Sequence, residues 1–253
     1  MNKIFLIINT LLLSIFTVSS NSFGWGFKKN NNHLQPYIGS YEQEIDGTNS
    51  YYVGDKSTKK VFLTFDAGYD NGNLAKILDV LDDKEVEATF FITGDFLTRF
   101  SDLVKEIDNR GHIIGNHTWS HKNITTLSEE QLEEEIKKVE SKYHEITNKE
   151  MSKYFRPPAG VFNKESLMKV SSLGYNTMFW SIAYKDWENN NGGSIEKSIN
   201  SVIDNLHNGA IILLHTVSNK NVSALPIIID EIRNNGYQIC SINEVIVNVK
   251  DFI

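Results

Sequence analysis

The sequence predicts an α/β domain in which parallel strands alternate with helices along most of the chain. Two observations lead to this prediction. Short apolar runs of strand length recur between residues 61 and 242, and segments with apolar residues three and four positions apart separate them. Strands and helices that alternate in this way form parallel sheets joined by right-handed crossovers. At 253 residues, the choice lies between a closed (β/α) barrel and an open doubly wound sheet, and both place functional residues at the carboxyl ends of the strands.

The predicted strands are short and rich in β-branched and aromatic residues. In chain order they are Val61–Phe65, Ala88–Thr93, His112–Asn116, Tyr154–Arg156, Thr177–Ile182, Ala210–His215 and Tyr237–Ile242.

Four segments outside the strands have the apolar spacing of a helix. The longest runs from Leu132 to Ile146, behind Ser128 and Gln131, which have the spacing of a capping box. The others cover Leu97–Ile107, Ile195–Leu206 and Leu225–Ile232, and each is followed by a glycine that can end a helix.

The composition limits the class of partner. An apolar fraction of 40% and an aromatic fraction of 11% are enough for a full hydrophobic core. The net charge of −7, with both signs mixed along the chain, argues against a nucleic-acid partner, which would favour a basic stripe. The single cysteine, Cys240, lies in an apolar run, and we expect it to be a small core residue rather than a nucleophile.

Residues 1–20 have the features of a secretory signal peptide. Lys3 precedes an almost unbroken apolar run from Ile4 to Val18, and Val18 and Ser20 fit the −3 and −1 positions of a cleavage site. An uncleaved membrane anchor is the alternative, and in both cases we expect the domain to be exported to the outer side of the cytoplasmic membrane. Residues 21–58, rich in Asn, Gly, Ser and Lys, are predicted to be a linker and a loosely structured lead-in.

Polar residues with catalytic potential follow directly after the predicted strands. Asp66 ends the first strand before a glycine turn, where it either enters an active-site mouth or caps the next helix. His117 and His121 follow the third strand, and two imidazoles four positions apart can bind one metal ion if the segment turns helically. This spacing alone is a weak signal, and its place at a strand end strengthens it.

The next three strands end in the same way. Arg156 follows the fourth strand, where it could bind a carboxylate through two nitrogens or could be incidental to a proline turn. Asp186 and Trp187 follow the fifth strand, and His215 ends the sixth, where a hydrogen-bonded core histidine is the alternative. Together these motifs place two acids, three histidines and an arginine at one end of a parallel sheet, which we interpret as an active site.

The order of these motifs resembles the polysaccharide deacetylase family, which includes chitin, nodulation-factor and peptidoglycan deacetylases. The motifs are Thr64-Phe65-Asp66-x-Gly68, His117-x-x-x-His121, Arg156-Pro157-Pro158-x-Gly160, Asp186-Trp187 and Leu213-x-His215. The resemblance covers residues 59–243, leaves 244–253 as a C-terminal tail, and implies a distorted (β/α)7–8 barrel. The segments 64–72 and 180–187 are most similar to the sporulation branch, which makes muramic δ-lactam in the spore cortex.

The resemblance also implies a role for each motif residue. Asp66 corresponds to the general base that takes a proton from the attacking water, and His215 to the general acid that protonates the leaving amine. Arg156 corresponds to the residue that orients the base, and Asp186 to the one that supports the acid. The residues implied to bind substrate are Trp187, Leu213 and Pro157.

The implied metal site departs from the family pattern. His117 and His121 match two histidine ligands, but Ala67 stands where the family has an aspartate ligand. Because catalytic zinc usually has three protein ligands, either Asp66, Asp70 or water completes the site, or the metal is bound weakly. We therefore expect a divalent metal, Zn²⁺, held by a reduced set of ligands.

Three functions are consistent with these motifs. The leading hypothesis is an exported N-deacetylase that acts on N-acetylmuramic acid in peptidoglycan glycan strands, followed by lactam closure. The second is a deacetylase of N-acetylglucosamine in peptidoglycan or chitooligosaccharides. The third is a glycan-binding relative without catalysis, but Asp66, Arg156 and His215 argue against it, because a binding module does not need a matched base and acid. We expect membrane contact only through the N-terminal segment, if it stays uncleaved.

Overall fold

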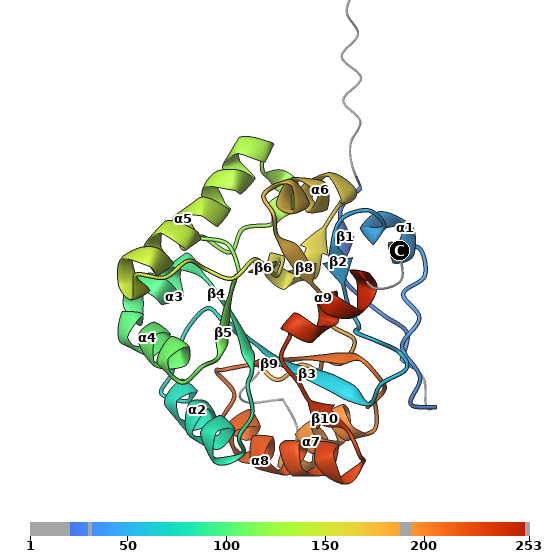
Figure 1. Ribbon diagram of the computed structural model, residues 1–253. Helices are drawn as coiled ribbons and strands as arrows, with labels where there is room; N and C mark the ends of the chain where they lie inside the picture. The colour runs from blue at the N-terminus through green and yellow to red at the C-terminus, as the bar shows by residue number, and fades with distance from the viewer. Residues whose placement is uncertain (1–20, 30–31, 188–193, 251–253) are drawn as a thin grey trace, which may run out of the picture.

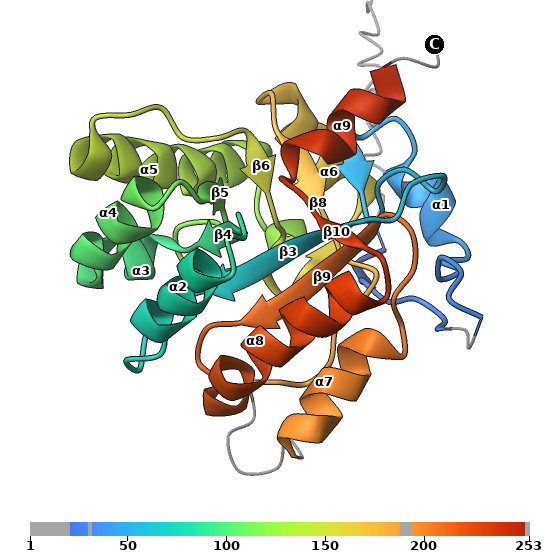
Figure 2. The ribbon, with the colours of Figure 1, turned by 60° about the horizontal axis from the view of Figure 1, so that its bottom comes forward.

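The computed structural model describes residues 21–29, 32–187 and 194–250. The predicted signal peptide lies outside the described residues. Within those ranges, no helix combines the length and the hydropathy needed to cross a bilayer. Strands occupy the centre of the molecule and helices surround them (Figures 1 and 2).

The central sheet is parallel at every strand pair that the described residues form in it. Its strands follow the order β10-β3-β4-β5-β6-β8-β2, and β9 also pairs with β3. The strands are β2 (Ser50–Tyr51), β3 (Lys60–Ala67), β4 (Thr89–Ile92), β5 (Ile113–Asn116), β6 (Tyr154–Phe155), β8 (Asn176–Met178), β9 (Ala210–His215) and β10 (Gln238–Ile239). Each of the predicted strands is therefore present, although most are shorter than predicted.

The sheet curls until its two ends meet. Ile182, just after β8, forms a parallel bridge with Ile212 of β9, and the amide of Leu213 donates to the carbonyl of Ile182 at 2.9 Å. Since β9 also pairs with β3 over residues 61–66, the strands form a distorted barrel. The predicted barrel is confirmed, and the open doubly wound sheet is excluded.

Helices cover the outside of this barrel (Figure 1). They are α2 (Leu74–Asp83), α3 (Gly94–Arg99), α4 (Ser101–Asn109), α5 (Glu129–Thr147), α6 (Lys164–Ser172), α7 (Ile195–Ile203) and α8 (Asn219–Asn234), with short 3-10 turns at Ile124–Thr126 and Pro158–Gly160. The predicted capping box is confirmed: Ser128 accepts from the amide of Gln131, and the Gln131 side chain accepts from the amide of Ser128.

Two features of the helices were not predicted. The apolar stripe from Leu97 to Ile107 is divided between α3 and α4, because Phe100 between them leaves the helical region at φ −128° and ψ 40°. The helices α2 and α6 were also missed. In α6, Asn163 and Ser166 form a capping box, which could have been recognised from the sequence.

Alternation along the strands separates the core from the site. Leu63 and Phe65 of β3 pack outward in the cluster that includes the surrounding helices, whereas Phe62 packs inside the barrel with Ile211 of β9. Because successive side chains of a strand point to opposite faces, Asp66 shares the inward direction of Phe62. Its carboxylate therefore enters the mouth of the barrel at the carboxyl end of β3.

The other end of the barrel is closed by α9 (Asn243–Lys250). Val245 of this helix belongs to the same buried cluster as Phe62 and Ile211. Cys240 is in this cluster too, which confirms it as a core residue. The predicted C-terminal tail is therefore helical as far as residue 250, and residues 251–253 lie outside the described residues.

The prediction of a loosely structured lead-in is wrong for the part of it that the structure describes. Residues 21–58 contribute β1 (Phe23–Gly24), α1 (Tyr41–Ile45) and β2, and β1 pairs antiparallel with β7 (Val161–Phe162). Trp25 and Ile38 are buried in a cluster with Phe162 and Phe179. The sequence holds a short signal of this, since Phe23, Trp25 and Phe27 alternate with glycines at the two-residue period of a strand. The Asn-, Ser- and Lys-rich residues around this run led to the prediction of a loose segment.

Candidate active site

The site lies where β3 and β9 end side by side. Asp66 and His215 are register partners across these two parallel strands, and both side chains line one cavity of about 510 Å³. The residues around the cavity are Asp66, Gly68, Tyr69, His117, His121, Ala159, Trp180, Trp187, Leu213, His215 and Val217. Most of its surface is apolar, and the ionisable groups are concentrated on the side of Asp66 and His215.

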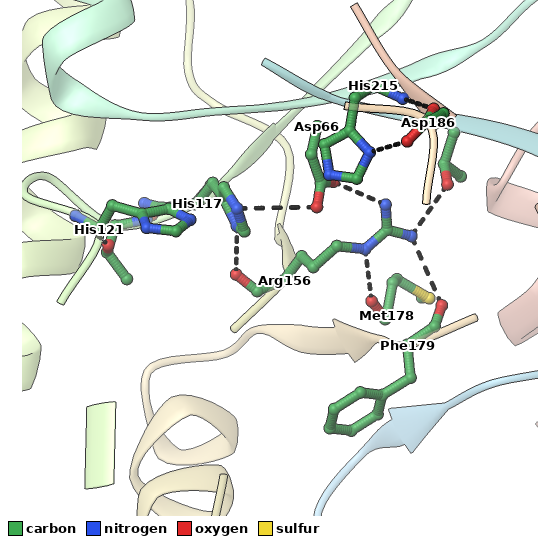
Figure 3. A network of polar contacts seen from close by, with 11 residues as sticks. Asp66, His117, His121, Arg156, Met178, Phe179, Asp186 and His215 are labelled. Carbon is green, nitrogen blue, oxygen red and sulfur yellow. Dashed lines mark hydrogen bonds and ion pairs between the residues drawn. The ribbon is translucent and has the colours of Figure 1, made fainter. Parts of the chain in front are cut away.

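Asp66 is held by a buried arginine (Figure 3). Nη1 of Arg156 donates to Oδ1 of Asp66 at 2.8 Å, and the guanidinium also donates to the Thr64 hydroxyl and to the carbonyl of Met178, each at 2.9 Å. Arg156 is fully buried and stacks on the ring of Phe91 at 4.1 Å. The guanidinium is thereby fixed, and it fixes the carboxylate in turn.

This environment keeps Asp66 ionised. Burial alone would raise the pKa of its carboxyl group, but the charges of Arg156, His117 and His215 and the hydrogen bond from Arg156 outweigh burial, so that the pKa is lowered. A carboxylate that stays charged at neutral pH can accept a proton from water. The alternative prediction, an aspartate that only caps a helix, does not fit these contacts.

His215 has the opposite electrostatic setting. Its Nδ1 lies 2.7 Å from Oδ1 of Asp186, and its backbone amide donates to Oδ2 of the same carboxylate at 2.7 Å. Burial opposes the charged imidazolium, but the hydrogen bond and charge of Asp186, together with Asp66, raise the pKa of His215. The pKa values of these two neighbouring side chains are thus shifted in opposite directions, lowered for Asp66 and raised for His215, which suits a base and an acid.

His117 and His121 lie together beside Asp66. Their ring centroids are 4.9 Å apart, and Nε2 of His117 is 3.7 Å from Oδ2 of Asp66. Burial lowers the pKa of His117 to about 4, so its ring is neutral at neutral pH. Nδ1 of His117 lies 2.7 Å from the carbonyl of Arg156, to which it donates, and this leaves the lone pair of Nε2 directed at the site. Histidines that bind a metal usually donate from the other ring nitrogen to a carbonyl or carboxylate, as His117 does here.

In the part of the chain that the structure describes, these two imidazoles are the side chains placed to hold a divalent metal. Among the described residues, no group of three or more His, Cys, Asp or Glu side chains is arranged to hold an ion. Ala67, at the position of the family's aspartate ligand, is fully buried in the apolar outer cluster. Asp70 does not line the cavity, since its two oxygens accept from the amides of Gly72 and Leu74 at the start of α2. Asp70 is therefore no ligand in this arrangement, and Asp66 is the carboxylate nearest the two histidines.

The three predicted substrate residues have different positions. Trp187 and Leu213 line the cavity, and the ring of Trp187 is 5.0 Å from that of His215 in an edge-on arrangement. Pro157 does not line it: it is buried, and its carbonyl accepts from the amide of Gly160. Pro157 shapes the turn that presents Ala159, at φ 52°, to the cavity. The structure therefore contradicts the expectation that Pro157 faces substrate, and its neighbour Ala159 lines the cavity instead.

The structure also reveals site residues that were missed. Tyr69 and Trp180 line the cavity. They lie outside the five motifs but inside the segments 64–72 and 180–187, and their place near strand ends could have indicated them. Asn221 had no such signal, because the fold brings it from the first turn of α8. Its amide nitrogen donates to Oδ2 of Asp186, and its oxygen accepts from the Tyr184 hydroxyl at 2.6 Å. Asn221 is thus the third group that fixes Asp186.

Replacing Asn221 by Leu is expected to lower kcat about tenfold and to move the basic limb of the kcat/KM profile to higher pH. The Asp186 carboxylate would lose one of its donors, would draw the His215 proton more strongly and would hold the ring less firmly. The pH dependence of turnover measures both effects. In the matched control, Tyr184→Phe, Asn221 keeps its bonds to Asp186, and the profile should equal that of the wild type. An unchanged profile in Asn221→Leu would remove Asn221 from this role.

The fold and the site define a barrel protein with a buried carboxylate and an imidazole–carboxylate pair side by side at its mouth. Residues 53–178 match the family described as polysaccharide deacetylase. The chain is 40% identical over 228 residues to the peptidoglycan-N-acetylmuramic acid deacetylase PdaA of Bacillus subtilis, which covers 90% of this chain and 87% of that protein. It is 34% identical over 192 residues to a peptidoglycan-N-acetylglucosamine deacetylase of Bacillus cereus, covering 73% and 67%.

A solved structure agrees with these sequence matches. The structure of Bacillus subtilis PdaA, described as a family 4 carbohydrate esterase, superposes with a TM-score of 0.87 at 39% identity and covers 90% of this chain and 98% of that one. The chain belongs to the polysaccharide deacetylase family, and it is an amide hydrolase by that membership.

Proposed function

We propose that this protein is an exported peptidoglycan deacetylase that removes the acetyl group from N-acetylmuramic acid. The observation that supports it best is the pairing of Asp66 with Arg156 and of His215 with Asp186 at adjacent strand ends. The likeness to PdaA, a peptidoglycan-N-acetylmuramic acid deacetylase, supports the choice of sugar. The predicted signal peptide supports export.

The proposed reaction is the hydrolysis of the acetamide by water. Asp66 takes a proton from the water while the water oxygen attacks the carbonyl carbon of the acetamide. His215 then donates a proton to the nitrogen as the C–N bond breaks, and acetate and a free amine leave. The apolar cavity wall of Trp180, Trp187 and Leu213 suits the acetyl methyl group.

A divalent metal would be held by His117 and His121. When bound, such an ion polarises the amide carbonyl and makes water more acidic. The chain's own residues provide the rest: Arg156 keeps Asp66 ionised and oriented, and Asp186 keeps His215 protonated. We propose Zn²⁺ as this metal. Ala67 cannot serve as a ligand, so water would take the place of the family's aspartate.

The freed amine of a muramic residue is next to the lactyl carboxyl group on the same sugar. Condensation of the two, with loss of one water, gives muramic δ-lactam. We include this closure in the proposal because the segments 64–72 and 180–187 resemble the sporulation branch. The site of action is then the spore cortex.

Mass spectrometry of peptide-free glycan strands incubated with the purified protein tests this function. We expect loss of acetyl from muramic residues, followed by loss of water, and higher turnover with added Zn²⁺ than with a chelator. Acetyl loss confined to glucosamine residues would contradict the proposed substrate. The absence of any acetyl loss, with or without metal, would favour the non-catalytic glycan-binding alternative.

One observation favours the second candidate function, deacetylation of N-acetylglucosamine. Among the described residues that line the cavity, none is a lysine or arginine that could pair with a lactyl carboxylate. Muramic and glucosamine residues differ in that group. Turnover of chitooligosaccharides compared with peptide-free glycan at matched concentrations separates the two substrates.

A further inference from the structure

The N-terminal strap, which we define as residues 22–29, crosses the back of the cavity wall. Its strand β1 pairs with β7, with Phe23 opposite Phe162. The next residue, Trp25, donates from its backbone amide to the carbonyl of Gly160 at 2.8 Å and from its indole nitrogen to the carbonyl of Trp180 at 2.9 Å. The strap therefore contacts two segments that both lie far from it in the sequence.

Both of these segments form the cavity wall. Ala159, beside Gly160, and Trp180 line the cavity. The ring of Trp25 stacks on Phe179 with the centroids 4.2 Å apart and the planes at 17°. The carbonyl of Phe179 accepts from Arg156 at 3.4 Å. Trp25 thus packs on Phe179 and Trp180. Of these two residues, Phe179 contacts the Arg156 guanidinium through its carbonyl, and Trp180 forms part of the apolar cavity wall.

The fit around Trp25 leaves little room for movement. Gly160 has a φ of +64°, and a Cβ placed on it would lie 2.9 Å from Cβ of Trp25 and 2.8 Å from the ring of Trp180. These distances are shorter than real carbon contacts, so only glycine allows the three residues to meet. Trp25 itself is buried, and its ring also stacks on that of Tyr41, with the centroids 5.6 Å apart.

We propose that Trp25 is a positioning residue that sets the place of Trp180 and Ala159 in the cavity wall. The catalytic unit then begins at the strap, upstream of the family match that starts at residue 53. Trp25 does not touch the reacting atoms; it acts through the wall that receives the acetyl group. The role of Trp25 is measured through the rate of deacetylation, and in this respect it rests on the proposed function.

The test is Trp25→Ala with chemical rescue by indole, which fits the space the side chain leaves and carries the same N–H donor. We expect kcat/KM per folded molecule to fall about 10²-fold, as small misplacements of positioning groups do. Indole should restore a large part of it in a concentration-dependent way. Indene, which has the same shape without the N–H group, should restore less, because it cannot donate to the carbonyl of Trp180.

The control is Tyr41→Phe, which removes the bond from the Tyr41 hydroxyl to the carbonyl of Gly24 within the same aromatic cluster and should leave kcat/KM unchanged. If Trp25→Ala melts at a lower temperature but keeps the wild-type kcat/KM, the strap is only structural. The same conclusion follows if indole raises the melting temperature without raising kcat/KM. The wild-type protein is assayed in parallel, so that a lack of deacetylation in it contradicts the proposed function and not the role of Trp25.

Discussion

Replacing Asp66 by Asn is expected to reduce kcat/KM for deacetylation by about 10²–10⁴-fold, the contribution of a general base. Asparagine keeps the size of the side chain but cannot accept a proton from water. The loss should persist across the pH range, because no group with the lowered pKa of Asp66 remains to titrate into the active form. Initial rates on peptide-free glycan between pH 4 and 9 measure it.

A neighbouring carboxylate offers a matched control for this variant. Asp70→Asn changes a residue four positions along the chain whose oxygens cap α2, so a rate within about threefold of the wild type is expected, because lost hydrogen bonds at a helix end act on stability rather than on chemistry. An Asp66→Asn enzyme with more than a tenth of the wild-type kcat/KM would show that another group is the base.

The closeness of Asp66 and His215 could be predicted from sequence because local rules fix the place of both residues. Asp66 and His215 end apolar strands, and parallel strands deliver their carboxyl ends to one edge. The inward direction of both side chains follows from the two-residue period of β3 and β9. The positions of the strand ends are thus enough to predict that Asp66 and His215 lie close together.

Residues that act over longer distances in sequence could not be predicted in this way. Asn221 reaches Asp186 from a helix whose position depends on the closed barrel. Trp25 has its partners, Gly160 and Trp180, more than a hundred residues away. The alternation of Phe23, Trp25 and Phe27 with glycines indicates a short strand but does not identify these partners. Pro157 was assigned to the substrate because a motif names it, whereas the turn it makes presents its neighbour Ala159.

Replacing Arg156 by Met is expected to have the second large effect, on both stability and rate. Arg156 is fully buried and pairs with Asp66 at 2.8 Å, and breaking a buried pair by removing one partner costs about 3–5 kcal/mol. Without Arg156, burial becomes the main influence on the pKa of Asp66. That pKa should therefore rise from its lowered value to above the value in the unfolded chain. The base would be protonated at pH values where the wild type is active, and the acid limb of kcat/KM should move to higher pH.

The sign of this change makes the stability measurement specific. In the wild type, the lowered pKa of Asp66 contributes stability that is present above the unfolded pKa and lost as the pH falls through the folded one. In the variant, the raised pKa reverses the contribution: the buried carboxylate destabilises the fold at neutral pH, and protonation relieves this as the pH falls. Urea unfolding should therefore show a larger difference in the free energy of unfolding between variant and wild type at pH 7 than at pH 4.

Arg110→Met is the control, because Arg110 bridges Asp79, Asp82 and Glu106 at the surface, where loss of ion pairs costs about 1 kcal/mol or less. A difference for Arg156→Met that is the same at both pH values would mean that the arginine stabilises the barrel by packing on Phe91 and does not govern the charge of the base.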